Sequence, residues 1–210
     1  MVHTHRDLGS LLTGDQAIAR LKAGNARFVA GKARFPTIQK DVLAMLASRQ
    51  APFATILGCS DSRVPPELLF DASFGELFVI RVAGNVLGPA VEGSLQYAGR
   101  HLRTPLFVVL GHQGCGAVEA AMAKKFEGAE FGSRVDRMLE EIEPALEPPD
   151  PIFSDEQQLA VAVEANVRHT LRQILYSPEG ERRRKEGFMK AVGAIYELKT
   201  GEVRFLEEEK

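Results

Sequence analysis

The sequence predicts a single α/β domain in which helices cover a mainly parallel central sheet. At 210 residues the chain is long enough for one such domain with a sizeable core. Three short apolar runs, each ending in glycine, favour strands that are buried on both faces, as parallel strands are. They lie at residues 51–58, 77–84 and 105–111. Helix-like segments follow the second and third runs, and this alternation is typical of a parallel sheet.

The first elements of the chain are expected to be helices. Residues 13–31 carry apolar side chains at near-helical spacing, namely Ala17, Leu21, Phe28 and Val29. Thr13 or Asp15 is available as the N-cap and Gly31 follows the last turn, so we expect an amphipathic helix. A second short helix is expected at about residues 39–47.

The remaining elements complete the alternation. Helices are expected at residues 89–102 and 116–126, and a loop at 144–151. Ser154 and Gln157 then form a capping box that opens a long helix. The expected core stripe of that helix is Ala160, Val163, Val167, Leu171 and Ile174. Two strands near residues 191–198 and 202–207 close the chain, so the sheet should hold about four parallel strands plus a C-terminal edge strand.

Composition excludes several classes of protein. The formal net charge of -2 offers no basic surface for nucleic acid. The one basic run, at residues 182–185, has acidic neighbours and is expected to be a solvated helix face. No apolar run approaches the roughly 20 residues of a membrane span or resembles a secretion signal. Only two cysteines are present, which suits a reducing compartment, so we expect a cytoplasmic protein.

Two short motifs place chemically reactive side chains where two predicted strands end. "GCSDSRVPPE" puts Cys59 and Asp61 after one strand, and "GHQGCGAV" puts His112 and Cys115 after another. Ligands bind outside the carboxyl ends of the strands in an open parallel sheet, so both motifs can contribute to one site. Thiolate, imidazole and carboxylate are donors that zinc prefers, and four of them complete a tetrahedron. Iron suits the set less well, because no further cysteines exist to hold a cluster.

Other interpretations of these motifs remain open from the residues themselves. Cys59 and Cys115 can be ordinary buried cysteines, or a pair that forms a reversible disulfide in a redox protein. A nicotinamide cofactor is not expected, because the glycines of "GHQGCG" do not follow the dinucleotide-binding pattern.

"CSDSRVPPE", followed by "RVAGN" and then "GHQGCGAV", resembles the β-class carbonic anhydrases in order, spacing and residue identity, and the resemblance extends from about residue 12 to 206. It implies reversible hydration of carbon dioxide to bicarbonate and a proton, with one Zn²⁺ per chain held by Cys59, His112 and Cys115. It also implies catalytic roles for Asp61 and Arg63. Asp61 is then either a fourth metal ligand or is released from the metal and paired with Arg63.

The resemblance further implies a substrate pocket and an oligomer. Gln50, Phe78 and Tyr97 stand at the offsets of pocket residues in the family's plant-like branch. Similar proteins build this pocket across a dimer interface, so a homodimer or a dimer of dimers is expected. An N-terminal helical arm, residues 12–48 of the single domain 1–210, is expected to pack on the partner subunit, with residues 13–31 as its main helix.

Some features depart from the family or leave its chemistry open. Arg81 matches the arginine of a non-catalytic bicarbonate site in some bacterial relatives, but Ile56 stands where that site has tryptophan. One alternative function is hydrolysis of carbonyl sulfide or carbon disulfide on the same scaffold. Another is a non-catalytic binding protein that contains zinc.

Overall fold

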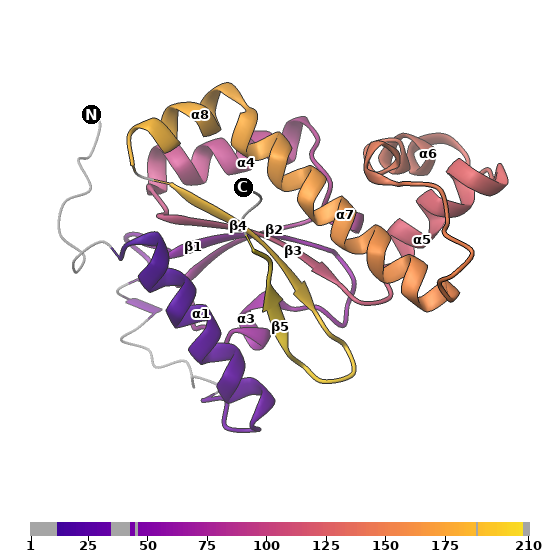
Figure 1. The fold of residues 1–210 in the computed structure, drawn as a ribbon. Helices are drawn as coiled ribbons and strands as arrows, with labels where there is room; N and C mark the ends of the chain where they lie inside the picture. The colour runs from indigo at the N-terminus through magenta and orange to yellow at the C-terminus, as the bar shows by residue number, and fades with distance from the viewer. Residues whose placement is uncertain (1–11, 35–42, 45, 188, 208–210) are drawn as a thin grey trace.

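The computed structural model describes residues 12–34, 43–44, 46–187 and 189–207. Figure 1 shows a central sheet with helices on both of its faces. The strands are β1 (Ala54–Gly58), β2 (Leu77–Arg81), β3 (Leu106–His112), β4 (Lys190–Tyr196) and β5 (Val203–Phe205). They are ordered β2-β1-β3-β4-β5; the first four are parallel, and β5 runs antiparallel to β4. The predicted sheet of four parallel strands and one C-terminal edge strand is confirmed.

The central strands explain why the sequence shows continuous apolar runs. Every residue of β1 and β3 is buried. Successive side chains of a strand point to opposite faces, so Ile56 and Leu57 enter two different core clusters. Both clusters contain residues from helices, and the sheet is therefore covered on each side.

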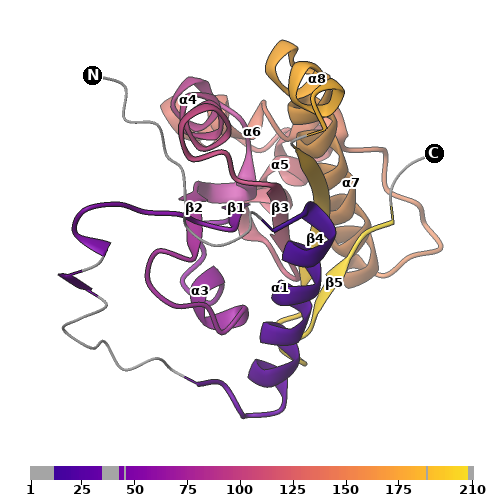
Figure 2. The same ribbon diagram turned by 90° about the vertical axis from the view of Figure 1, so that its left-hand side faces the viewer.

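Figure 2 shows the two helical layers from the side. One layer holds α1 (Gly14–Val29) and the short α3 (Pro66–Leu69). The other contains α4 (Pro89–Tyr97), α5 (Gly116–Met122), α6 (Ser133–Leu139), α7 (Asp155–Tyr176) and α8 (Pro178–Lys185). The helices predicted at 89–102 and 116–126 are present, and each ends in a π-helical turn, at Ala98–Leu102 and Ala123–Glu127. The described part of the chain contains no helix that is long and apolar enough to span a membrane.

Helix α1 packs on the sheet of its own chain. Thr13 is its N-cap and forms a capping box with Gln16, while Gly31 follows the helix with a positive φ of 65°. The buried face includes Ala17 and Leu21 as expected, whereas Val29 is exposed. The helix expected at 39–47 lies mostly outside the described residues, and packing of the arm on a partner subunit stays a prediction.

Helix α7 begins at the predicted capping box of Ser154 and Gln157. Its buried residues are Ala162, Val163, Asn166, Val167, Thr170 and Ile174. The prediction that Ala160 lies in the core is wrong, because Ala160 is exposed. Val167 lies at the centre of the face of α7 that contacts the sheet. Its side chain packs over the two strand glycines Gly111 and Gly193, which leave room for the helix to approach closely.

The basic run at 182–185 lies in α8, but it is not solvated throughout as predicted. Arg183 is 7% exposed, and its Nε donates to Glu179 at 2.9 Å. The same carboxylate also accepts from Arg100 and Arg182. This cluster of charges joins α8 to the π-helical turn after α4.

Candidate metal centre

The chemically reactive side chains gather at one end of two neighbouring strands. Strands β1 and β3 are parallel neighbours, with Gly58 opposite Leu110. Cys59 follows the end of β1, and His112 is the last residue of β3. The sheet register therefore brings together residues that lie more than 50 positions apart in the chain.

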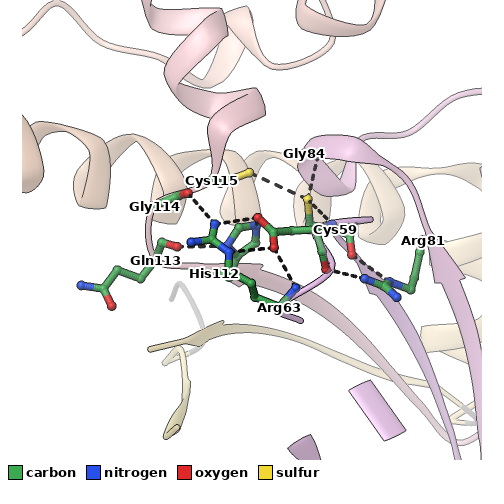
Figure 3. Close-up of polar contacts among 9 residues, drawn as sticks. Cys59, Arg63, Arg81, Gly84, His112, Gln113, Gly114 and Cys115 are labelled. Carbon is green, nitrogen blue, oxygen red and sulfur yellow. Dashed lines mark hydrogen bonds and ion pairs between the residues drawn. The ribbon is translucent and has the colours of Figure 1, made fainter. Parts of the chain in front are cut away.

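Cys59, His112 and Cys115 form a compact buried group. Their ligand atoms, two Sγ and one ring nitrogen, all lie within 4.8 Å of one another, and all three residues are buried. Both cysteines are free, with a distance of 4.0 Å between their sulphur atoms. Figure 3 shows the two sulphurs facing each other beside the His112 ring.

The hydrogen bond of His112 fixes the tautomer of its ring. Nδ1 lies 3.0 Å from the backbone carbonyl oxygen of Gln113, and because a carbonyl only accepts, Nδ1 carries the proton. Nε2 is then an acceptor, and it is buried without a hydrogen-bond partner. A metal-binding histidine typically donates its other ring N–H to a carbonyl in this way. The unpaired Nε2 is therefore suited to coordinate a cation.

The two thiols cannot both ionise easily without a cation. A hydrogen bond from Cys115 lowers the pKa of Cys59 to about 4, although burial opposes this shift. The same interaction raises the pKa of Cys115, and burial raises it further. A divalent ion removes the conflict by stabilising both thiolates, and two sulphurs with one imidazole nitrogen suit zinc. These three residues thus fit a zinc ion.

Asp61 lies beside this group but is bound to Arg63. The carboxylate accepts from the Arg63 backbone N–H at 2.9 Å and from two nitrogens of the guanidinium. This side-chain hydrogen bond is the main reason why the pKa of Asp61 is held well below its usual range. Its Oδ2 is 4.0 Å from Nε2 of His112. Asp61 is thus paired with Arg63 in the structure, and its role as a fourth metal ligand stays a prediction.

Arg81 and Gly84 hold the backbone and sulphur of the first motif. Arg81 donates from Nε to the carbonyl of Cys59 at 2.9 Å and from Nη2 to the carbonyl of Asp61. The amide of Gly84 donates to Sγ of Cys59 at 3.4 Å, as does the amide of Asp61 (Figure 3). The sequence singled out Arg81 for a different site, and nothing in the motif indicated these contacts.

The three predicted pocket residues do not join this group within one chain. Phe78 and Tyr97 lie together, with ring centroids 6.1 Å apart, but Phe78 stands opposite Thr55, four residues before Cys59. Four residues of strand correspond to about 13 Å. Gln50 precedes β1, whereas Cys59 follows it, so the strand separates them. His101 is exposed, and its ring packs against the Tyr97 ring with the centroids 5.0 Å apart.

The sequence is similar to those of known carbonic anhydrases. Residues 54–203 match the family model described as carbonic anhydrase. The chain is 48% identical over 126 residues to "Carbonic anhydrase 2" of Mycobacterium tuberculosis, an alignment that covers 60% of this chain and 61% of that protein. It is 34% identical over 179 residues to "Carbonic anhydrase" of Pseudomonas aeruginosa, covering 77% of this chain and 76% of the relative.

Solved structures agree with the sequence comparison. A tetrameric β-carbonic anhydrase of Sordaria macrospora superposes with a TM-score of 0.73 at 23% identity, covering 88% of this chain and 93% of that one. The β-carbonic anhydrase CcaA superposes with a TM-score of 0.69 at 26% identity, covering 92% of both chains. The alignment with the mycobacterial protein leaves more than a third of that relative unmatched, but the family model covers most of this chain. The chain therefore belongs to the carbonic anhydrase family, in its β class.

Proposed function

We propose that this protein catalyses the reversible hydration of carbon dioxide to bicarbonate and a proton, with one zinc ion held by Cys59, His112 and Cys115. The observation that carries this proposal is the buried Cys-His-Cys group with the Asp61 carboxylate beside it. The relatives described above, each named a carbonic anhydrase, support it. Neither sulfide hydrolysis nor a purely structural role for zinc has comparable support.

Zinc is the metal of the family, and when bound it supplies a Lewis acid that makes water reactive near neutral pH. A structural zinc site is closed by four protein ligands, whereas a catalytic site uses three. With Asp61 held by Arg63, three protein donors remain in the group. This donor count favours a catalytic site.

Asp61 and Arg63 would orient the reacting water. An ionised carboxylate only accepts hydrogen bonds, so Asp61 takes one from the water and aims the lone pair of that water at carbon dioxide. Arg63 holds the carboxylate at two points, and this keeps Asp61 ionised and fixed in direction. The side chain of Asp61 is 18% exposed, so substrate can approach it from one side.

We also propose that Gln50, Phe78 and Tyr97 line the pocket of a neighbouring chain. In their own chain they lie at the opposite end of β1 from Cys59. They lie near β2, an edge strand of the sheet, where the aromatic side chains of Phe74 and Tyr97 are 56% and 46% exposed. A homodimer, or a dimer of dimers, that joins two such edges would bring these residues to the partner's metal.

We further propose that residues 1–210 form a single domain and that the arm at 12–48 contacts the partner subunit. We also propose a cytoplasmic location. The free cysteines of the metal group support a reducing compartment, because a disulfide between them would remove two ligands.

The test of function compares substrates on zinc-loaded protein. Stopped-flow assays should show rapid hydration of carbon dioxide, with much slower release of sulfide from carbonyl sulfide and carbon disulfide. Cys59→Ser, which removes one zinc ligand, should abolish the hydration. Zinc-loaded wild-type protein that releases sulfide but does not hydrate carbon dioxide would contradict the proposal.

A further inference from the structure

Asn166 is a polar residue in the apolar face of α7. It is 0% exposed, and its neighbours on the same face of the helix, Val163 and Val167, are 2% and 0% exposed. A buried amide is costly unless it is hydrogen-bonded, and Oδ1 of Asn166 is buried without a hydrogen-bond partner among the described residues, so an apolar side chain would pack there at lower cost. The role of Asn166 must therefore lie in the hydrogen bond that it makes.

That hydrogen bond leads toward the metal group through a single residue. Nδ2 of Asn166 donates to the carbonyl oxygen of Gly84 at 2.8 Å. The orientation of the side-chain amide is fixed, because only its nitrogen can donate to a carbonyl. On the other side of Gly84, the backbone N–H donates to Sγ of Cys59 at 3.4 Å (Figure 3).

Gly84 needs such an anchor because of its conformation. It has φ 70° and ψ 13°, in the left-handed region that favours glycine, within the short turn Ala83–Asn85. A Cβ at this position would lie 2.7 Å from Cδ1 of Ile142 and 3.2 Å from Cβ of Ala117. Glycine has the greatest backbone freedom of any residue, so a contact from outside the turn is needed to fix the direction of its peptide groups.

We propose that Asn166 is a positioning residue for the Cys59 sulphur. By holding the Gly84 carbonyl, it keeps the Gly84 N–H aimed at the thiolate. Hydrogen bonds to a thiolate withdraw electron density from the sulphur and tune how strongly it donates to a metal. The inference rests on the proposed role of Cys59 as a metal ligand, and it assigns part of the control over that ligand to a helix more than 80 residues further along the chain.

The test uses cobalt(II) in place of zinc, because its absorption spectrum reports on the sulphur ligands. In Asn166→Leu the Gly84 peptide is released, and the thiolate-to-cobalt charge-transfer band should move to lower energy. Zinc affinity, measured by competition with a chelator, should weaken by about 10-fold. Asn166→Ser has a side chain too short to reach the Gly84 carbonyl directly, so it should shift the band in the same direction.

Thr170→Val is the matched control, because Thr170 lies one turn further along α7 and is 1% exposed. Its cobalt band and zinc affinity should equal those of the wild type. An unshifted band in either folded Asn166 variant, or an equal shift in Thr170→Val, would overturn the inference. A wild-type protein that takes up neither metal would instead contradict the proposed function, so the two failures are distinguishable.

Discussion

The guanidinium of Arg63 holds the Asp61 carboxylate at both oxygens, with Nε–Oδ1 and Nη2–Oδ2 distances of 2.9 and 2.7 Å. The two residues are separated by one position in the chain, so the pair is a local feature of the loop after β1. Asp61 therefore points beside the Cys-His-Cys group while its charge is balanced by arginine. This pairing leads to the first prediction.

Arg63→Ala should lower the turnover of carbon dioxide far more than it lowers zinc content. The three proposed zinc ligands remain. Asp61, however, loses the guanidinium that fixes the direction of its carboxylate and that competes with the metal for it. A misplaced catalytic group commonly costs about 100-fold in rate. Stopped-flow hydration rates with metal analysis of the same samples provide the measurement.

Arg204→Ala is the control, since Arg204 is an exposed arginine of β5 that pairs with Glu164 of α7 and has no contact with Asp61. It should leave turnover and zinc unchanged. Equal turnover in Arg63→Ala and wild type would show that the Asp61–Arg63 pair does not serve catalysis.

Mixing two inactive variants should restore activity if the pocket is shared between chains. Gln50→Ala keeps the metal group but lacks one pocket residue, and Cys59→Ser keeps the pocket residue but lacks a ligand. A mixed dimer of the two contains one complete site. After the subunits are unfolded together and refolded as an equal mixture, we expect about a quarter of wild-type activity, because half of the dimers are mixed and each has one of two sites.

The control for this experiment refolds each variant separately, and each should stay inactive. A mixture that is no more active than the two variants alone would contradict a pocket built across two subunits. Full activity of Gln50→Ala alone would contradict the role of that residue.

Glu179 should make stability depend on pH in the acid range. The pKa of Glu179 is lowered from an ordinary value of 4.5 to about 2. The largest cause is its hydrogen bond from Arg100, and hydrogen bonds from Arg183 and Arg182 add to it. Because the folded-state pKa is below the unfolded one, the stabilisation is present above about pH 4.5 and is lost as the pH falls toward 2.

In Glu179→Gln the buried Arg183 loses its charged partner. The melting temperature should fall by roughly 3–10 °C at pH 7, and the difference from wild type should shrink as the pH is lowered through 4. High salt should reduce the difference as well, because Arg100 and Arg182 are about half exposed. Thermal melts over a pH series check this, and a difference that grows on acidification would contradict it.

A substitution at Gly24, with a second glycine as control, tests the close packing of α1 on the residue that follows α3. A Cβ on Gly24 would overlap the backbone carbonyl oxygen of Phe70, which follows α3. Gly24→Ala should therefore force α1 away from the backbone that follows α3 and destabilise the protein by about 1–3 kcal/mol or more. Urea unfolding measures this change.

Gly93→Ala is the matched substitution, because Gly93 lies inside α4 and a Cβ there meets no atom within 4 Å. It should stabilise the protein by about 0.5–1 kcal/mol, since alanine is the better helix former. Equal effects of the two substitutions would show that close packing of α1 on Phe70 is not required.

The features that could be predicted from the sequence depend on local signals. The strands β1 and β3 were visible because both faces are buried and the runs are continuously apolar. The capping box at Ser154 and the N-cap at Thr13, one of the two candidates for that position, depend only on neighbouring residues. The metal group was predictable because Cys59 and His112 come at the ends of strands that a parallel sheet brings together.

The features that could not be predicted depend on contacts between distant segments. Arg183 is buried because it packs against Gly99 in the π-helical turn after α4, and a run of basic residues gives no sign of this contact. The rotation of α7 that exposes Ala160 is set by Gly111 and Gly193 under Val167. Asn166 left one signal, a polar residue between apolar positions of the α7 stripe, but its partner Gly84 is 82 residues away.

The most direct test of the central claim is a zinc K-edge absorption spectrum of the purified protein, combined with elemental analysis. We expect about one zinc per chain, with two sulphur donors near 2.3 Å and at least one nitrogen donor. These are the donors that Cys59, Cys115 and His112 provide. A protein that hydrates carbon dioxide at full rate with far less zinc, or a spectrum without sulphur donors, would contradict the claim that this buried group holds the catalytic metal.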